Sequence, residues 1–557
     1  MIKTRWYKDA VVYQIYPRSF CDSNGDGIGD LRGIISKLDY IKDLGVDAVW
    51  LSPIYKSPND DNGYDISDYT DIMDEFGTLD DFKELLEGLH SRGIKLIMDL
   101  VANHTSDEHY WFRESKKSVD NPYRDYYIWR KGRGKDGKKP PNNWTSSFGG
   151  KAWEYDETTG EWYLHLFSRK QPDLNWENPK VRQEIADICN YWMDMGVDGF
   201  RCDVITYISK KSGLPDGKFN PIFCGSEQYV VGPRYHEFIK ELNAASWSRY
   251  DSFTVGEAAG ITISNAYECI DESVCELDTV FSFEHLCYAD MYFLVIPHRL
   301  SLKKFKKILG SWQALPKTCQ NTLFLENHDQ PRSLGRFTGN YSGYRYEAAT
   351  ALAVAMQLQR GTPFVYQGQE IGMTNCKFED KDYQDIMFRQ IMDIVKYIPF
   401  GKCLARYCFS RRARDHARTP MQWSAGENAG FSSGKPWMMV NPNYKFINAN
   451  KDMSADKSIY NFYAKLHAYR KGNDVIIDGD YKDICPNSSD IFAYERKLGD
   501  KTVLVVVNFK NKAVKFKLPA EYVGRASQLQ LSNYADAQER IVDTKLRPYE
   551  ASVYSVD

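Results

Sequence analysis

The sequence predicts an α/β protein built on a (β/α)8 TIM barrel, with a small domain inserted after the third strand and an antiparallel β-sandwich at the C-terminus. Two patterns support this fold class. Between residues 11 and 366, short apolar runs alternate with segments of helical periodicity, as in parallel strands joined by crossover helices. After about residue 481, strand-like runs follow one another without helices between them, which indicates an antiparallel sheet.

Eight apolar runs are expected to form the barrel strands, the number that closes such a fold. They are residues 11–16, 45–51, 94–101, 197–202, 253–255, 279–283, 322–325 and 363–366. Helices are expected among them, at residues 34–43, 79–91, 181–195 and 234–243. Residues 104–176 break the alternation, and because a structureless loop of that length is rare, a small folded insertion is predicted. The predicted divisions are 1–103 and 177–480 for the barrel, 104–176 for the inserted domain and 481–557 for the C-terminal domain.

The composition excludes several kinds of partner and location. A net charge of −3 over 557 residues gives no basic surface for nucleic acid or an anionic membrane. Residues 1–8 are polar and no run of 18 apolar residues occurs, so neither a secretory signal nor a membrane-spanning helix is predicted. The 12 cysteines are scattered without Cys-x-x-Cys pairs, which argues against zinc sites and disulfides. We expect a cytoplasmic protein that is a monomer.

The stretch Gly-Phe-Arg-Cys-Asp-Val-Ile, residues 199–205, carries the first candidate chemistry. Side chains alternate along a strand, so Arg201 and Asp203 are expected to point to the same side. An Asp held ionised by a neighbouring Arg at the end of a strand suits a nucleophile. A purely structural ion pair is the alternative.

Carboxylates also stand at the ends of three other predicted strands: Asp99, Glu257 and Asp329. Two of these stretches add a histidine, His104 and His328. The carboxyl ends of barrel strands form one pocket, so these groups are expected to converge. Carboxylates close together raise one another's pKa, which leaves one protonated as an acid and suits glycoside hydrolysis. A barrel metalloenzyme is the alternative use of the same carboxylates.

Several stretches resemble the α-amylase clan of glycoside hydrolases, and within it the oligo-1,6-glucosidase branch. Besides the four strand-end stretches, they are Val-Tyr-Gln-Ile-Tyr-Pro-Arg-Ser-Phe at 12–20, Asp-Asn-Gly-Tyr-Asp-Ile-Ser-Asp-Tyr at 61–69, and residues 171–176, 361–374 and 418–423. They occur in the family's order, and the resemblance runs from about residue 6 into the C-terminal domain.

The resemblance implies a catalytic role for three carboxylates. Asp203 is the expected nucleophile that forms a covalent glucosyl intermediate, and Glu257 the acid and base. Asp329 is expected to hold the sugar's 2- and 3-hydroxyls, through hydrogen bonds that strengthen as the ring flattens. Arg201 is expected to keep Asp203 ionised.

The resemblance also implies a closed, exo-acting pocket. Asp61 and Tyr64 match positions at its end, and Arg418 matches an arginine expected to pair with Asp61 and close the pocket around a terminal glucose. Taken by themselves, residues 61–63 predict only a turn. The other expected substrate contacts are His104, His328, Phe167 and Gln171. For His104 and His328 a structural role is the alternative, because isolated histidines more often have one.

The loop Asp-Ser-Asn-Gly-Asp-Gly-Ile-Gly-Asp, residues 22–30, places oxygen ligands at alternate positions. It lacks the Glu of an EF-hand, because Gly33 stands at the twelfth position. The resemblance implies a structural Ca2+ site, with Mg2+ as a possible occupant, while a metal-free Asx-turn loop is the alternative. The expected ligands are Asp22, Asn24, Asp26, the carbonyl of Ile28, and Asp30.

These observations predict a retaining exo-α-glucosidase that acts on isomaltose and short isomalto-oligosaccharides, without an organic cofactor. Val204 follows the nucleophile and, by resemblance, favours α-1,6 over α-1,4 linkages. Activity on sucrose, α-1,4 or phosphorylated disaccharides is the alternative, and two departures from the family, Ala258-Ala259 and a short segment 206–228, leave the leaving-group preference open. Sucrose isomerisation is disfavoured because residues 284–288 lack the Arg-x-Asp-Arg-like motif. A non-catalytic transporter partner is disfavoured because all three carboxylates are present.

Overall fold

The computed structural model describes residues 4–220, 223–286, 290–291, 296–297, 300–339 and 343–557. Residues 287–288, part of the segment compared with sucrose isomerases, and residues 221–222 of the short segment 206–228 lie outside this description. Within the described residues, no helix combines the length and the apolar character needed to cross a membrane.

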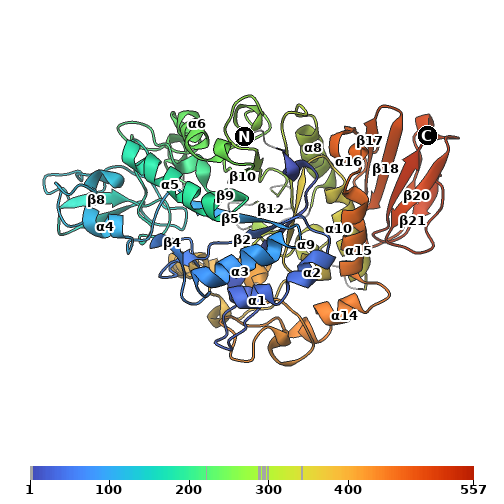
Figure 1. The fold of residues 1–557 in the computed structure, drawn as a ribbon, viewed down its shortest axis with the longest axis horizontal. Helices are drawn as coiled ribbons and strands as arrows, with labels where there is room; N and C mark the ends of the chain where they lie inside the picture. The colour runs from blue at the N-terminus through green and yellow to red at the C-terminus, as the bar shows by residue number, and fades with distance from the viewer. Residues whose placement is uncertain (1–3, 221–222, 287–289, 292–295, 298–299, 340–342) are drawn as a thin grey trace.

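Eight parallel strands form the barrel, and each coincides with one of the eight predicted runs (Figure 1). They are β1 (Val12–Ile15), β2 (Ala48–Leu51), β5 (Lys95–Val101), β9 (Gly199–Asp203), β10 (Phe253–Glu257), β11 (Thr279–Phe281), β14 (Thr322–Leu323) and β15 (Thr362–Tyr366). Their order is β11-β10-β9-β5-β2-β1-β15-β14. Side chains join the two end strands: the hydroxyl of Thr279 donates to the carbonyl of Gln320 (2.8 Å), and that of Thr322 to the carbonyl of Val280 (2.9 Å). The predicted barrel is therefore confirmed.

Helices surround the barrel because each turns an apolar face to the strands. They include α1 (Leu31–Ile35), α2 (Leu38–Asp43), α3 (Leu79–His90), α5 (Pro179–Met195), α6 (Tyr235–Ala245), α7 (Tyr267–Ile270), α8 (Leu302–Gln313), α9 (Ser333–Phe337) and α10 (Arg345–Gln357). The prediction of a single helix at 34–43 is wrong in one respect. The chain forms two short helices there, separated by Ser36 and Lys37.

A small antiparallel sheet is the centre of the inserted segment. It consists of β6 (Trp129–Arg130), β8 (Glu161–Leu164) and β7 (Trp153–Asp156), in that order, with α4 (Tyr110–Ser115) before it. Trp144, Trp153 and Trp162 pack into its own apolar core, which explains the high aromatic content of this segment. A bridge between His104 and Asp173 ties the two ends of the segment together beside the barrel.

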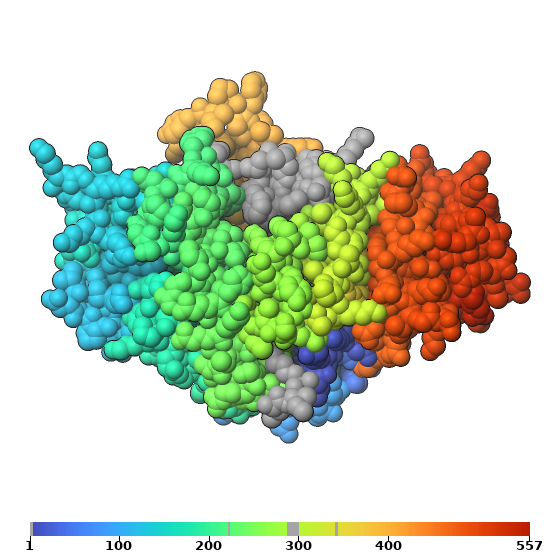
Figure 2. Space-filling model, turned by 90° about the horizontal axis from the view of Figure 1, so that it is seen from above, coloured from blue at the N-terminus to red at the C-terminus, as the bar shows by residue number. Residues whose placement is uncertain are grey.

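The C-terminal strands form an antiparallel five-stranded sheet, as predicted. Its order is β16 (Asp480–Asp483), β17 (Ile491–Leu498), β18 (Lys501–Asn508), β22 (Ala551–Val556) and β20 (Ser527–Ser532), and a pair, β19 (Val514–Phe516) and β21 (Thr544–Leu546), lies apart from it. One face of the large sheet joins the barrel core through α10, and the other packs with β19 and β21. The inserted and C-terminal domains lie at opposite ends of the molecule (Figure 2).

The remaining elements connect these parts. They are the pairs β3 (Tyr55–Lys56) with β4 (Asp68–Ile72) and β12 (Asp290–Met291) with β13 (Ile296–Pro297), and the helices α11 (Ile386–Ile394), α12 (Gly401–Arg412), α13 (Asp415–Arg418), α14 (Ala449–Met453), α15 (Ile459–Arg470) and α16 (Asp474–Asp478).

Candidate active site

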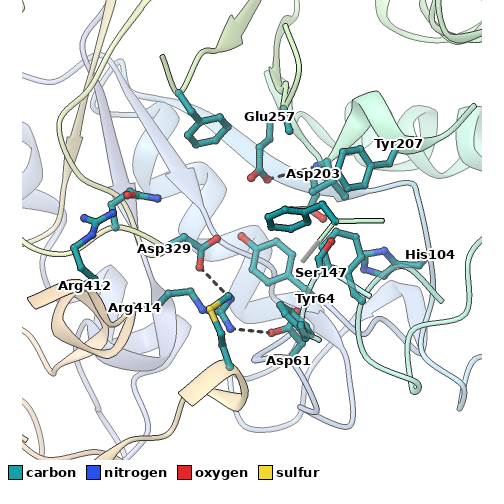
Figure 3. Close-up of a pocket in the computed structure, with 18 residues that line it drawn as sticks. Asp61, Tyr64, His104, Ser147, Asp203, Tyr207, Glu257, Asp329, Arg412 and Arg414 are labelled. Atoms are coloured by element: carbon teal, nitrogen blue, oxygen red, sulfur yellow. Dashed lines mark hydrogen bonds and ion pairs between the residues drawn. The ribbon is translucent and has the colours of Figure 1, made fainter. Parts of the chain in front are cut away.

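A pocket lies at the carboxyl ends of the barrel strands, where the strand-end carboxylates converge (Figure 3). Most of the predicted site residues line it: Asp61, Tyr64, His104, Phe167, Asp203, Val204, Glu257 and Asp329. The others lie behind this lining and contact it: Gln171 bonds to Asp61, Arg201 to Asp203, His328 to Tyr64 and Arg418 to Asp329. The structure thus brings the predicted catalytic and substrate-binding residues together.

One buried guanidinium, that of Arg201, holds three carboxylates. Its Nη1 donates to Asp99 Oδ1 (2.8 Å) and to Asp203 Oδ1 (2.7 Å), and its Nη2 contacts Glu257 Oε2. Residues 201 and 203 share a face of β9, and the register of the sheet sets Asp99 of β5 directly opposite Arg201. The predicted contact between Arg201 and Asp203 is confirmed.

Burial makes this cluster electrostatically unusual. It raises the pKa of Asp203 well above its usual value and that of Asp99 to about 6, while Arg201 opposes the rise in both. Burial and the neighbouring carboxylates outweigh Arg201 at Asp203, so the prediction that Arg201 keeps Asp203 ionised is not supported by this pKa direction. A cluster of this kind can provide an ionised carboxylate and a proton donor side by side.

Asp329 lies on the opposite side of the pocket and is anionic. Arg418 Nη2 donates to its Oδ1 at 2.6 Å, and Arg414 Nη1 at 3.3 Å. Burial raises the pKa of this carboxyl, but His328 and the two arginines together hold it far below its ordinary value. Asp329 is therefore an anionic hydrogen-bond acceptor that faces the pocket.

The arginine beside Asp61 differs from the predicted one. Arg414 Nη2 lies 3.8 Å from Asp61 Oδ1 (Figure 3). Arg418 instead donates to Asp329 and to the carbonyl of His328. The predicted ion pair between Asp61 and Arg418 is therefore wrong. The physical reason is that a two-pronged contact with Asp385 (2.9 and 2.7 Å) directs Arg414 toward the pocket.

Arg414 was missed in the sequence, although a signal for it exists. It precedes Arg418 by one helical turn, in a segment that carries arginines at 411, 412, 414 and 418. Burial raises the pKa of Asp61 to about 7, and Arg414 is the largest opposing influence. The protonation of Asp61 therefore depends on Arg414.

His328 connects the pocket lining to the barrel interior. Gln14 Nε2 lies 2.8 Å from its Nδ1, and the hydroxyl of Tyr64 lies 2.7 Å from its Nε2. The amide of Gln14 donates, so Nδ1 accepts and Nε2 carries the proton. Tyr64 then donates to Asp99 Oδ2 (3.1 Å). Burial lowers the pKa of His328 to about 3, so its ring is neutral. Its Nε2 can bond directly to a sugar hydroxyl only if it releases the hydroxyl of Tyr64.

The inserted segment supplies one wall of the pocket, which includes His104 and is supported by Gln171. The amide nitrogen of Gln171 lies 3.2 Å from both Asp61 Oδ2 and His104 Nε2. Burial lowers the pKa of His104 to about 4, so its ring is neutral at physiological pH. Lys210, in the segment after β9, pairs with Asp173 (2.7 Å) and donates to Asn103 Oδ1 (2.8 Å). These two contacts hold this wall against the segment after β9.

Val204, next to Asp203, has a strained backbone. Its φ of 35° and ψ of 38° lie in the left-handed region, which a β-branched residue rarely adopts. This turn ends β9 and places the Val204 side chain on the pocket wall.

The rest of the pocket wall was not predicted, and it adds four aromatic side chains. It includes Phe148, Tyr207, Phe223, Phe283 and Met387, together with Ser147, Ala259, Gln330 and Arg412. These residues come from loops far apart in the sequence, so no spacing pattern marks them. Their flat apolar faces suit the C–H faces of sugar rings.

The loop predicted to bind Ca2+ is organised by its own oxygen side chains. Asp22 Oδ1 accepts from the N–H of Asn24 (2.9 Å), Asn24 Oδ1 from that of Asp26 (2.8 Å), and Asp26 Oδ1 from that of Ile28 (2.8 Å). Asp30 accepts from Gly33 and Ser23. The oxygen donor set fits a hard cation, but the same bonds describe an Asx-turn loop, so the Ca2+ site stays a prediction.

The chain is similar to known proteins over nearly its whole length. The chain matches the family described as "Alpha amylase, catalytic domain" over residues 14–479, and "Alpha-amylase SusG C-terminal domain" over residues 491–553. It is 52% identical to the oligo-1,6-glucosidase of Parageobacillus thermoglucosidasius, over 99% of both chains. It is 43% identical to the trehalose-6-phosphate hydrolase of Bacillus subtilis (strain 168), over 99% of this chain and 98% of the other.

Solved structures show the same relationship. The trehalose-6-phosphate hydrolase of Bacillus licheniformis superposes with a TM-score of 0.93 at 44% identity, over 99% of both chains. The trehalulose synthase MutB of Pseudomonas mesoacidophila MX-45 gives 0.93 at 41% identity, over 100% of both chains. Sequence, fold and the arrangement of the strand-end carboxylates agree: the chain belongs to the α-amylase family of glycoside hydrolases.

Proposed function

We propose that this protein is a retaining exo-α-glucosidase that cleaves the α-1,6 bond of isomaltose and short isomalto-oligosaccharides. The observation that carries the proposal is the contact of Arg201 with both Asp203 and Glu257. Retention requires two carboxyl groups about 5–5.5 Å apart, and a shared guanidinium favours such a spacing. The relatives named as oligo-1,6-glucosidases support the choice of linkage.

Asp203 and Glu257 have different parts in the proposed reaction. Asp203 attacks the anomeric carbon, and the bond to the leaving oxygen breaks as Glu257 gives that oxygen its proton. Glu257, now ionised, takes a proton from water, whose oxygen displaces Asp203 and releases α-glucose. Asp329 holds the hydroxyls of the ring as positive charge develops, and its strong ionisation suits that role.

The exo action rests on the closed end of the pocket. Arg414 bridges Asp61 and Asp329, and Gln171 bonds to Asp61 from the inserted segment. These charged groups present hydrogen-bonding partners to the end of a terminal glucose. In this proposal their contacts across the end of the pocket block a longer sugar chain, so the substrate enters with its non-reducing end first.

A phosphorylated disaccharide is the second candidate substrate. Two trehalose-6-phosphate hydrolases resemble the chain at 43–44% identity. Arg412 lines the pocket near Arg414 and adds a cation to that wall (Figure 3). A cation there favours an anionic leaving group, so trehalose 6-phosphate belongs among the substrates tested.

The proposed substrate is tested by glucose release from isomaltose, maltose, sucrose, trehalose, palatinose and trehalose 6-phosphate. Isomaltose is expected to give the highest kcat/KM. A preference for trehalose 6-phosphate over isomaltose by tenfold or more would establish the second candidate in its place.

The proposed nucleophile is tested by Asp203→Asn, which should lower kcat by several orders of magnitude. Asp187→Asn is the matched control, because Asp187 is an exposed residue on α5 and should keep full activity. Both variants should melt within a few degrees of the wild type. An Asp203→Asn enzyme with more than a few per cent of wild-type kcat contradicts the assignment.

A further inference from the structure

A cluster of three metal-ligating side chains lies in the helix layer, away from the catalytic pocket. It consists of His236 on α6, Cys269 on α7 and Glu276 in the segment before β11. One ligand atom from each lies within 4.8 Å of the other two. No member of the cluster lines the pocket described above. We propose that these three residues form a binding site for a thiophilic divalent cation of the Zn2+ type.

The distances between His236 and Glu276 match a hydrogen bond and also suit a shared ion. His236 Nδ1 lies 3.1 and 3.0 Å from the two oxygens of Glu276. Atoms that share one tetrahedral Zn2+ lie about 3–4 Å apart, since each bond is about 2.0–2.3 Å long. A small movement of Cys269 therefore completes the set, and water takes the fourth position. Nitrogen, sulfur and oxygen are the ligand atoms that Zn2+ prefers.

The other nitrogen of His236 lies near a carboxylate, although beyond hydrogen-bond distance. Its Nε2 lies 3.9 Å from Glu268 Oε2. Metal-binding histidines usually direct their second ring nitrogen to a carboxylate, which fixes the tautomer and increases the basicity of the ligand. On binding, the imidazole proton moves from Nδ1 to Nε2, and the Cys269 thiol releases its proton to solvent.

A buried hydroxyl lies beside the cluster. Tyr235 is fully buried, and its hydroxyl is within hydrogen-bonding reach of the Cys269 thiol. Burial, followed by the nearby Cys269 and Glu276, raises the pKa of this tyrosine well above its usual value, which places its hydroxyl next to them. A thiol is a weak acceptor, whereas a metal-bound thiolate accepts well, so the ion would strengthen the contact between Tyr235 and Cys269.

The surroundings permit entry and exchange. Cys269 and Glu276 are buried, but the side chain of His236 is 36% exposed and opens the site to solvent. Lys240 lies 3.6 Å from Glu276, and its side chain is 52% exposed. It balances the Glu276 charge when the site is empty and can turn into solvent when a cation arrives. The ion would link α6 to the segment between α7 and β11.

Cobalt is the probe for this site, because a Co2+–thiolate bond gives a charge-transfer absorption that oxygen ligands do not. The full-length protein is treated with chelator, then titrated with Co2+ and afterwards with Zn2+. We expect a thiolate band that saturates at one equivalent and is abolished by Zn2+, with a Zn2+-dependent rise in Tm. Hydrolysis of isomaltose serves as the check of folding in every variant.

Three variants give the test its specificity. Cys269→Ser and His236→Gln should lose the band, or weaken Co2+ binding at least tenfold, while keeping their glucosidase activity. Cys275→Ser is the matched control, since Cys275 is an exposed thiol six residues away, and it should keep the band. Absence of a thiolate band in the wild type overturns the proposal, as does a band that survives in Cys269→Ser or is lost in Cys275→Ser. If Cys269→Ser does not fold, His236→Gln decides.

Discussion

At the scale of a single residue, Val204 is the proposed determinant of linkage preference. Its β-branched side chain is stiff and stands on the pocket wall beside Asp203, the proposed nucleophile. An α-1,6 linkage has an extra rotatable bond, so the leaving sugar can swing away from this side chain. A directly attached α-1,4 partner has less freedom to avoid it.

The first prediction is that Val204→Ala raises the maltose-to-isomaltose ratio of kcat/KM. Removing two methyl groups is worth about 1–3 kcal/mol, or roughly 10–200-fold. Initial rates on both disaccharides measure the ratio. Because alanine tolerates the left-handed backbone better than valine, the Tm should not fall by more than a few degrees. An unchanged ratio removes Val204 from the account of linkage preference.

Arg414 is the second residue on which the pocket depends. It is within ion-pair distance of Asp61, Asp329 and Asp385. Arg414→Met leaves these carboxylates short of a counter-charge in a buried site, at a cost of about 3–5 kcal/mol. We expect kcat/KM to fall by 100-fold or more, and the Tm to fall as well. Arg411→Met, an exposed neighbour in the same segment, is the control and should match the wild type in both measurements.

At the scale of elements, His467 joins α15 to the end of α2. Its Nδ1 contacts the carbonyl of Leu44 at 2.8 Å, and burial lowers its pKa to about 4. Between pH 6.5 and 4 the unfolded chain binds a proton that the folded chain does not. This histidine therefore reduces stability as the pH falls through that interval.

The third prediction follows from this difference in protonation. His467→Gln removes the titrating group while an amide can still donate to Leu44. The variant should be less stable than the wild type near pH 7.5, and its deficit should shrink by about 1.4 kcal/mol at pH 5.5. Urea unfolding of both proteins at the two pH values measures this change. A deficit that is independent of pH, or that grows in acid, contradicts the assignment of a neutral buried ring.

The loop at residues 22–30 is a second element whose role we propose, as a structural Ca2+ site. If it binds Ca2+, added Ca2+ should raise the Tm of chelator-treated protein, as expected for a ligand of the folded state only. Asp26→Asn should reduce that rise, while kcat stays unchanged because these residues do not line the pocket. A Tm that does not respond to Ca2+ supports the metal-free Asx-turn alternative instead.

At the scale of the whole molecule, one core joins the barrel and the C-terminal sheet. Tyr494 and Val505 of that sheet belong to the same buried cluster as the barrel strands. Arg496 reaches across to Gln313 of α8 (3.1 Å). α10 is buried on nearly every side between the two parts, which explains why it is apolar all round.

This shared core predicts that the two parts unfold together. Loss of activity and loss of the far-ultraviolet circular dichroism signal on heating should coincide in one transition. Truncation after residue 480 should give an insoluble or inactive protein, since it exposes the face of α10. Two separated transitions, with activity that outlasts the first, contradict a common core.

Sequence patterns were sufficient to predict the barrel and the convergence of its strand-end carboxylates, for a physical reason. Apolar runs mark buried parallel strands, and the ends of such strands converge wherever the barrel closes. Asp203, Glu257 and Asp329 could therefore be placed in one pocket before their distances were known. The family resemblance then supplied their roles.

Other parts of the site depend on tertiary packing that no spacing reveals. Arg414 and Arg418 lie one helical turn apart, and only the position of Asp385 decides which of them reaches Asp61. The aromatic wall comes from separate loops. Likewise His236, Cys269 and Glu276 show no metal-binding spacing, and the packing of α6 against the chain before β11 brings them together.

The most direct test of the proposed function is the configuration of the first glucose released from isomaltose. Proton NMR during the first minutes of hydrolysis distinguishes the two anomers before they interconvert. Double displacement at Asp203 predicts that α-glucose appears first and that the β-anomer grows only through mutarotation. The initial appearance of β-glucose contradicts the role of Asp203 as nucleophile, and failure to cleave isomaltose contradicts the proposed substrate.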